Sequence, residues 1–361
     1  MHAQKQTLAA REAKLEMLQQ QLTASIEQLV TGEDWGRAMT FAARFRSRSF
    51  NNTMLIYAQH AAAYEQGRVP VPSPSYVGGF RQWLSLGRTV MKGQSGYGIL
   101  APITARFASS TPTLTETWRR LASSERPRAG EVVRSRMVGV RPAYVWDVSQ
   151  TTGDPIPELP RPALLDGQAP AGLWDGLADQ ITSAGYGLRL VSDAHAIGGA
   201  NGLTDFLTHE VSVRTDMDEA AQTKTLAHEL GHVLLHAPTN RDLTTAIAAD
   251  ATTHGGIAEV EAESVALMVG AAHGLDTSTY TIPYVATWAS SVPGKSPTQV
   301  VQAAERVRAT AITIIDKLDT TTIGDGTPPG LDRNALTHQT PPPVLRPVEA
   351  AARHEEHGVD L

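Results

Sequence analysis

The sequence predicts an α+β protein with two domains, and three observations support this. The chain of 361 residues is long enough for two separate hydrophobic cores. Its charge is unevenly distributed: residues 1–150 hold 19 Lys and Arg against 10 Asp and Glu, whereas the remainder holds 12 against 27. The proline-rich stretch 155–170 separates these halves and is typical of a linker.

Residues 1–32 predict an amphipathic N-terminal helix. Apolar residues recur at helical spacing from Leu8 to Leu29, with Gln, Glu and Lys on the other face. The helix could pair with a second chain, but packing on its own domain is favoured and the oligomeric state stays open. Further helices are expected at 35–46 and 52–65, before the three prolines of GRVPVPSPSY end the pattern.

The first domain is predicted over residues 33–154. A short helix, a turn and a strand are expected over residues 78–102. Residues 107–131 are rich in Ser, Thr, Arg and Pro, which predicts an inserted loop. A strand pattern then resumes over residues 132–148.

The second domain is predicted over residues 171–323. Its expected elements are a helix, two strands and three further helices, at 173–183, 187–191, 210–214, 218–236, 257–273 and 296–318. The tail 324–361 holds six prolines and predicts a disordered segment, because it offers too little apolar surface to form a core.

Composition excludes several classes of protein. The values of 41% hydrophobic and 19% charged residues are those of a soluble globular protein. No apolar run approaches the roughly 20 residues that a membrane span needs, and the polar N-terminus lacks the core of a secretory signal. A cytoplasmic protein without membrane contact is therefore expected. The absence of cysteine excludes disulfides, thiolate metal sites and cysteine nucleophiles, so any metal must bind His, Asp or Glu.

The segment EAAQTKTLAHELGHVLLH carries an HExxH motif on a predicted helix. His228 and His232 lie one turn apart on one face, so both imidazoles can reach one metal ion. Glu229 follows the first histidine, where it can accept a proton from a water that the metal activates. The motif predicts a Zn²⁺ site of the metallopeptidase type, with Glu229 as general base.

A catalytic zinc needs a third protein ligand, and the helix GIAEVEAESVALMVG offers three glutamates. Glu259 and Glu263 are four residues apart and share a face, whereas Glu261 points elsewhere. We expect Glu259 to be the third ligand and Glu263 to hold a ligand histidine by its other nitrogen. Glu261 remains an alternative third ligand.

His236 continues the histidine pattern of the HExxH helix by a further turn. It lies about 12 Å along the helix axis from His228. Three histidines so arranged cannot converge on one ion, so His236 is expected to have a structural role.

The basic half interleaves arginines with aromatic residues, as in ARFRSRSFNN and FRQWLSLGRTVMKG. Cations bind phosphates and aromatic rings stack on unpaired bases, so this pattern indicates binding to single-stranded nucleic acid. The candidate contacts are Arg44, Arg46, Arg48, Phe50, Asn51, Asn52, Arg81, Trp83, Arg88 and Lys92. The alternative is that the aromatic residues belong to the core and the arginines form a solvated face.

Both halves resemble one family. SFNNTMLIYAQ and GFRQWLSLGRTVMKGQSGYGILAP, within residues 33–150, resemble the single-stranded-DNA-binding domain of ArdC-like antirestriction proteins. LAHELGHVLLH and AEVEAESVA, within residues 171–290, resemble the zincin-like domain of those proteins and the metallopeptidases of the ImmA/IrrE group. The insertion at 107–131 departs from the shorter family pattern.

The resemblance implies a protein that protects plasmid or phage DNA, a mobile genetic element entering a cell as a single strand. It also implies that the strand EVSVR is an edge strand beside the metal, where an extended peptide can pair. The protein substrate is not predicted. Two alternative functions stay open: a DNA-binding protein whose zinc site is structural or vestigial, and a regulatory peptidase that cleaves a repressor.

Overall fold

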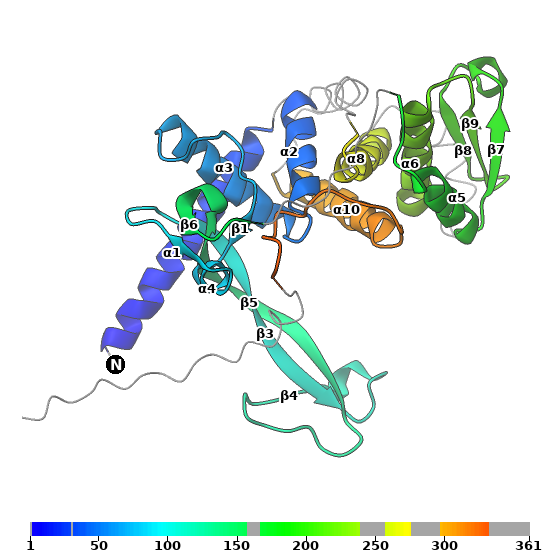
Figure 1. The fold of residues 1–361 in the computed structure, drawn as a ribbon. Helices are drawn as coiled ribbons and strands as arrows, with labels where there is room; N and C mark the ends of the chain where they lie inside the picture. The colour runs from blue at the N-terminus through cyan, green and yellow to red at the C-terminus, as the bar shows by residue number, and fades with distance from the viewer. Residues whose placement is uncertain (1, 30–31, 157–166, 239–256, 276–296, 332–361) are drawn as a thin grey trace, which may run out of the picture.

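The computed structural model describes residues 2–29, 32–156, 167–238, 257–275 and 297–331 (Figure 1). Three helices open the chain: α1 (His2–Glu27), α2 (Gly32–Arg44) and α3 (Phe50–Glu65). They confirm the three helices predicted from apolar spacing. Within the described ranges, none of the helices combines the length and apolar character that a bilayer span requires.

The sheet of the N-terminal half is antiparallel and is ordered β1-β5-β3-β4. Its strands are β1 (Val77–Gly78), β3 (Tyr97–Ser109), β4 (Arg119–Arg120) and β5 (Val132–Asp147). A short helix, α4 (Phe80–Ser85), leads to a two-stranded sheet of β2 (Arg88–Val90) and β6 (Thr151–Gly153). The stretch 107–131 is only partly the expected loop, because β3 continues to Ser109 and β4 pairs Arg120 with Phe107.

The C-terminal half packs helices beside a three-stranded sheet (Figure 1). Its elements are α5 (Leu173–Ser183), β7 (Gly187–Val191), β8 (Gly202–Asp205), β9 (Glu210–Arg214), α6 (Glu219–His236), α8 (Ile257–Ala272) and α10 (Pro297–Ile315). The strand EVSVR is β9, and it is the central strand of the order β7-β9-β8 instead of the expected edge. The edge strands are β7 and β8; β7 runs parallel to β9, and β8 runs antiparallel to it. The sequence did not predict β8. Its sequence GLTD is too short and polar to give a strand signal.

The larger of the two hydrophobic clusters among the described residues spans both halves. Its buried side chains join α1, α2 and α3 to α5, β9, α6, α8 and α10. At its centre the buried indole Nε1 of Trp35 on α2 donates to Ser264 Oγ on α8 at 2.9 Å. A second, smaller cluster lies within the N-terminal half, around Phe45, Val77 and Tyr97. The division into two domains therefore stays a prediction. The predicted linker lies largely in 157–166, outside the described residues.

Residues 324–331 are packed, which corrects the prediction of disorder from residue 324 onward. The backbone N–H of Val77 donates to the Gly326 carbonyl at 2.8 Å, so this segment extends along β1. Gly326 has φ +79°, and a Cβ there would lie 2.4 Å from the ring of Phe45. Only glycine fits this approach. Residues 332–361 lie outside the described part of the chain, and for them disorder stays a prediction.

Backbone N–H and C=O groups at the free edge of β3 form hydrogen bonds with side chains of α3. The Asn52 amide donates to the Leu100 carbonyl at 3.0 Å and accepts from the Leu100 N–H at 2.8 Å. Two helical turns further on, the Gln59 amide makes the same pair of bonds with Gly98, at 2.9 and 2.8 Å. Because unpaired backbone groups at a buried edge are costly, these two amides fix α3 on the sheet.

We expect Asn52→Ala to lower the free energy of unfolding by about 2 kcal/mol, because it leaves the N–H and C=O of Leu100 without partners. Chemical denaturation measures this. Asn51→Ala is the matched control, since the Asn51 amide oxygen has no hydrogen-bond partner in the structure. Equal stability of the Asn52→Ala protein and wild type would contradict the structural role.

Candidate metal centre

The crossing of α6 and α8 builds the site. Asp218 caps the start of α6 by accepting from the Ala221 N–H at 2.7 Å. Gly231, inside the HExxH turn, allows α8 to approach closely, because a Cβ there would lie 3.1 Å from the Cα of Ala262. The two predicted motifs, one on each helix, therefore face one another.

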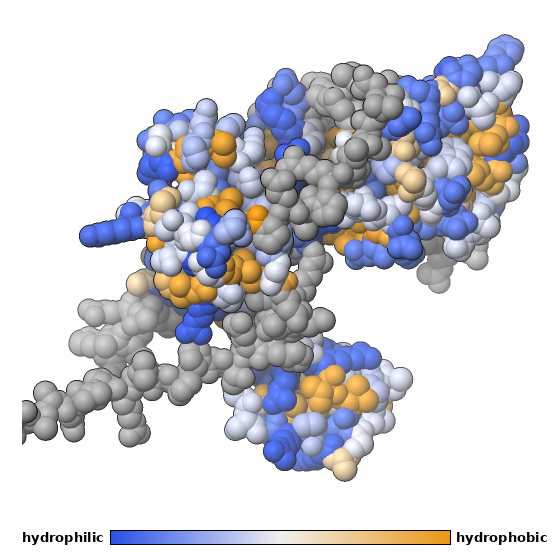
Figure 2. Space-filling model, viewed as in Figure 1, coloured by the Kyte–Doolittle hydropathy of each residue, from blue (hydrophilic) through white to orange (hydrophobic). Residues whose placement is uncertain are grey.

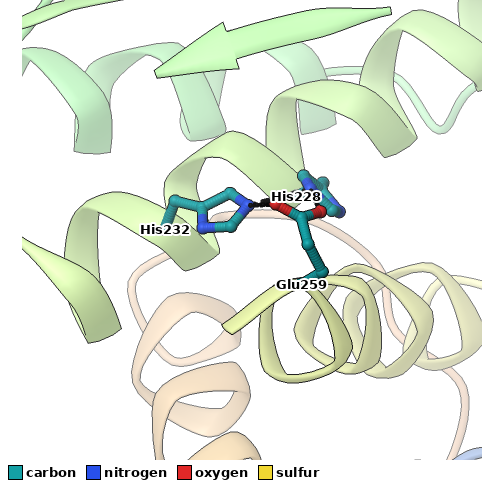
Figure 3. A group of neighbouring side chains, drawn as sticks. All are labelled: His228, His232 and Glu259. Atoms are coloured by element: carbon teal, nitrogen blue, oxygen red, sulfur yellow. Dashed lines mark hydrogen bonds and ion pairs between the residues drawn. The ribbon is translucent and has the colours of Figure 1, made fainter. Parts of the chain in front are cut away.

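His228, His232 and Glu259 come together at this crossing (Figure 3). Their donor atoms all lie within 4.8 Å of one another. The carboxylate of Glu259 lies 3.4 Å from His228 Nε2 and 3.3 Å from His232 Nε2, and the two Nε2 atoms are 3.0 Å apart. Two imidazoles and one carboxylate converging in this way form a donor set typical of catalytic zinc.

Glu263 supports His228 from the other side of the ring. Its Oε2 lies 2.7 Å from His228 Nδ1, and its Oε1 lies 2.5 Å from Lys224 Nζ. Burial raises the pKa of the Glu263 carboxyl, but contacts with His228 and Lys224 outweigh burial and hold that pKa below its usual value. A charged Glu263 accepts a hydrogen bond from Nδ1–H, which leaves Nε2 of His228 free to bind a metal.

His232 is supported by a chain of three further side chains. Its Nδ1 lies 3.1 Å from His236 Nδ1, and His236 Nε2 lies 3.2 Å from Glu261 Oε2. The other oxygen of Glu261 accepts from Arg306 on α10. If His232 binds metal through Nε2, then Nδ1–H donates to His236, and His236 donates through Nε2–H to Glu261.

These hydrogen bonds behind His232 define the positions of His236 and Glu261. His236 contacts His232 and Glu261 instead of the metal position, in accord with its expected structural role. Glu261 points toward His236 and Arg306, so the structure favours Glu259 over Glu261 as third ligand. Burial raises the pKa of Glu261, but its contacts with His236 and Arg306 lower it on balance, so the carboxylate is charged.

The electrostatics of the cluster attract a cation. Burial alone lowers the pKa of His228, but the carboxylates of Glu259 and Glu263 outweigh this effect and raise that pKa to about 10. Burial likewise raises the pKa of Glu259, yet hydrogen bonds from His228 and His232 hold it far below its usual value. Carboxylates that stabilise a positive charge on an imidazole would also stabilise a divalent cation at the same position.

Glu229 lies beside the ligands and is 4% exposed. Thr204 Oγ1 on β8 donates to its Oε2 at 2.7 Å. A Cβ on Gly202 would lie 2.6 Å from Glu229 Oε1, so a larger residue at this point would displace the Glu229 carboxylate. Thr204 and Gly202 were not predicted, because a four-residue strand without an alternating pattern gives no signal in the sequence.

A cavity of about 410 Å³ opens in front of these groups. Its wall includes β8 residues Gly202, Leu203 and Thr204, together with Glu229 and the three candidate ligands. The outer edge of β8 has no neighbouring strand among the described residues. The cavity therefore joins a strand edge to a cluster of metal-binding side chains.

The predicted DNA contacts are not brought together in this way. Phe50 and Trp83 are each 0% exposed, so neither ring is available to stack on a base. Trp83 Nε1 donates to the Trp146 carbonyl at 3.0 Å, and the Phe50 N–H donates to Glu305 on α10 at 3.0 Å. Both residues are core residues, as in the alternative interpretation of the aromatic pattern.

Three of the predicted arginines bind backbone within the protein. Arg46 donates to the Ile323 carbonyl at 3.0 Å, Arg48 to the Val77 carbonyl at 2.6 Å, and Arg88 to the Thr151 carbonyl at 3.0 Å. Burial lowers the pKa of Arg48 to about 10. These three arginines and Asn52 form hydrogen bonds within the protein that stabilise the fold. Asn51 is half-buried, and Arg44, Arg81 and Lys92 are exposed.

Fold and site together define an α+β protein with a group of two histidines and one glutamate that can bind a metal. Residues 13–145 match a family described as the N-terminal domain of anti-restriction factor ArdC. The match covers α2, α3 and most of the antiparallel sheet, and it ends before α6 and α8. It confirms the resemblance stated for the N-terminal half.

Similar whole proteins include an uncharacterized protein of Bacillus anthracis, 23% identical over 329 residues. The matched region is 86% of this chain but 52% of that relative, so the chain spans about half the relative's length. Two crystal structures of the antirestriction protein ArdC from the R388 plasmid are also similar. The metal-free structure is 18% identical, and the match covers 74% of this chain and 84% of the ArdC chain. The Mn(II)-bound structure is 17% identical, and the match covers 82% of this chain and 97% of the ArdC chain. Both have a TM-score of 0.41.

We expect His236→Ala to weaken metal binding about 10- to 100-fold, because His232 loses the group that orients its ring. The measurement is a chelator competition with Zn²⁺. Leu234→Ala is the matched control, since this residue is exposed on the same helix turn and should leave affinity unchanged. His228→Ala should remove stoichiometric metal altogether. Unchanged affinity in the His236→Ala protein would show that the chain of side chains behind His232 has no such role.

Proposed function

We propose that this protein is an antirestriction-like protein that binds single-stranded DNA and carries a zinc-dependent metallopeptidase site. The observation that supports the peptidase most directly is the convergence of His228, His232 and Glu259 beside Glu229. The match of residues 13–145 to the ArdC N-terminal domain supports the antirestriction and DNA-binding assignments.

The residues present fit a zinc ion. Two imidazole nitrogens and one carboxylate supply a neutralising donor set, and each ligand histidine has a hydrogen-bonded partner on its second nitrogen. Three protein ligands would leave a four-coordinate zinc one position for water or a substrate. The three residues line the cavity that a substrate would enter. Zinc bound there would supply Lewis-acid polarisation of a substrate carbonyl.

Glu229 would act as the general base. Its buried carboxylate lies in the cavity wall, where it can accept a proton from an attacking water and return it to the leaving amine. The hydrogen bond from Thr204 holds Oε2 and fixes the orientation of the carboxylate relative to β8. An extended peptide pairing with the outer edge of β8 would present its scissile bond to this carboxylate.

Glu229→Gln should retain bound zinc and lose peptide hydrolysis by a factor of about 10² to 10⁴, because the amide cannot accept the proton. Metal analysis and turnover of a peptide library cleaved by wild type measure the two effects. The same variant also tests the role in the cell, where the measurement is how well the protein protects incoming DNA. If Glu229→Gln protects DNA as well as wild type does, the biological role is DNA occupancy with a structural zinc.

The DNA-binding proposal follows from the basic N-terminal half, whose residues 1–150 carry a balance of +9. We expect the protein to bind a single-stranded oligonucleotide more tightly than a duplex of the same length. The logarithm of affinity should fall with the logarithm of salt concentration by about 0.7 per phosphate contact. Fluorescence anisotropy over a salt series measures both. Equal affinity for the two forms, or no binding at low salt, would refute single-strand recognition.

A further inference from the structure

A long two-stranded arm extends away from the rest of the molecule (Figure 1). We define the arm as residues 103–141, which comprise the outer part of β3, β4 and the first part of β5. Within it, strands β3 and β5 pair from Ile103 opposite Gly139 to Ser109 opposite Val132. Since a strand rises about 3.3 Å per residue, β3 as a whole spans roughly 40 Å. Such a ribbon buries little apolar surface, so core packing does not explain its length.

The arm is strongly basic. It contains eight arginines and no lysine, against three glutamates and no aspartate, which gives a charge of +5. Two of the glutamates, Glu125 and Glu131, bind Arg119. Glu131 contacts it with both oxygens, at 2.9 and 2.8 Å. The acidic side chains of the arm are thus largely committed to one arginine, and most of the other guanidinium groups face solvent.

Two of these arginines are held in place on aromatic rings. The guanidinium of Arg134 lies 5.0 Å from the ring centre of Trp118, and that of Arg136 lies 5.1 Å from the same ring and 5.7 Å from Phe107. Arg134 and Arg136 are two residues apart on one strand and so lie on the same face of the arm. Stacking orders their side chains and so reduces the entropy cost of binding a ligand, while both residues stay exposed.

Exposed apolar side chains lie on the opposite face of β5 from these two arginines, because Val133 and Met137 alternate with Arg134 and Arg136 along the strand. Val133, Met137 and Val138 are all exposed, and Met137 is 67% exposed. In Figure 2 the end of the arm shows a hydrophobic patch surrounded by hydrophilic residues. A ribbon with guanidinium groups on one face and uncovered apolar side chains on the other suits a flexible ligand that has both phosphates and accessible bases. In a duplex the base faces are stacked and hidden, so this arrangement favours a single strand.

We propose that the arm is the element that binds single-stranded DNA. Arg134 and Arg136 contact phosphates, and the apolar side chains of the arm contact unpaired bases. Arginine suits this role better than lysine, because its planar fork binds phosphate with two hydrogen bonds and stacks on rings. The inference rests on the proposed DNA-binding function and moves its surface from the residues around Phe50 and Trp83 to the arm.

Two arm variants test this inference with a fluorescent oligothymidylate of about 20 nucleotides and a duplex of equal length. The first is Arg134→Gln with Arg136→Gln. The second removes residues 104–138 and joins Ile103 to Gly139, which face each other across the pair, through an Asn-Gly turn. The control is Arg37→Gln with Arg189→Gln, which removes two exposed arginines elsewhere. Zinc content and thermal unfolding establish that each variant is folded.

The double arm variant should bind the single strand about tenfold more weakly, with a salt slope reduced by about 0.7 for each phosphate that the variant no longer binds. The deletion should bind more weakly still, and the control should change affinity less than twofold. If wild type binds and both arm variants bind equally well, the inference fails while the proposed DNA-binding function survives. If wild type itself does not bind, the proposed function fails first. An arm that binds the duplex more tightly than the single strand would refute the single-strand assignment.

Discussion

The close crossing of α6 and α8 is the constraint on which the candidate site depends. Gly231 allows the backbone of Ala262 to approach, and this approach places Glu259 between His228 and His232. A side chain at position 231 would separate the helices and move the carboxylate away from the imidazoles. Gly231 occupies one of the two unspecified positions of the HExxH motif. The residue at that position therefore affects whether the three donors can reach one ion.

The polar partners behind the ligands connect the site to the whole molecule. His236 and Glu261 lead from His232 to Arg306 on α10. The neighbouring residue on that helix, Glu305, accepts from the N–H of Phe50 at the start of α3. Helix α10 is thus tied both to the metal-binding cluster and to the basic half. The arrangement of α3 against α10 is then part of what holds His232 in orientation.

Sequence reasoning identified the candidate metal ligands that the structure brings together, because helical periodicity is local. The spacing of His228 and His232, and of Glu259 and Glu263, fixes which side chains share a face without knowledge of the tertiary fold. It could not place Thr204, whose role arises from a short strand that pairs only in the folded protein. It also misplaced Phe50 and Trp83, because an aromatic residue between arginines looks the same in the sequence whether it faces solvent or the core. Most of residues 107–131 is the loop that composition predicted, but composition gave no sign that residues 107–109 and 119–120 would pair as strands.

The hydrophobic cluster that spans both halves has a practical consequence for dissecting the protein. Helix α8 is buried along almost its whole length, with α6 on one side and α2 on another, and Trp35 reaches Ser264 one residue beyond Glu263. A fragment cut at the proline-rich stretch would leave that face of α8 open to water, and an exposed apolar helix face leads to aggregation. Failure of an isolated C-terminal fragment to bind metal would therefore report on disrupted packing. The smallest unit in which the chemistry can be judged includes the helices that precede the sheet.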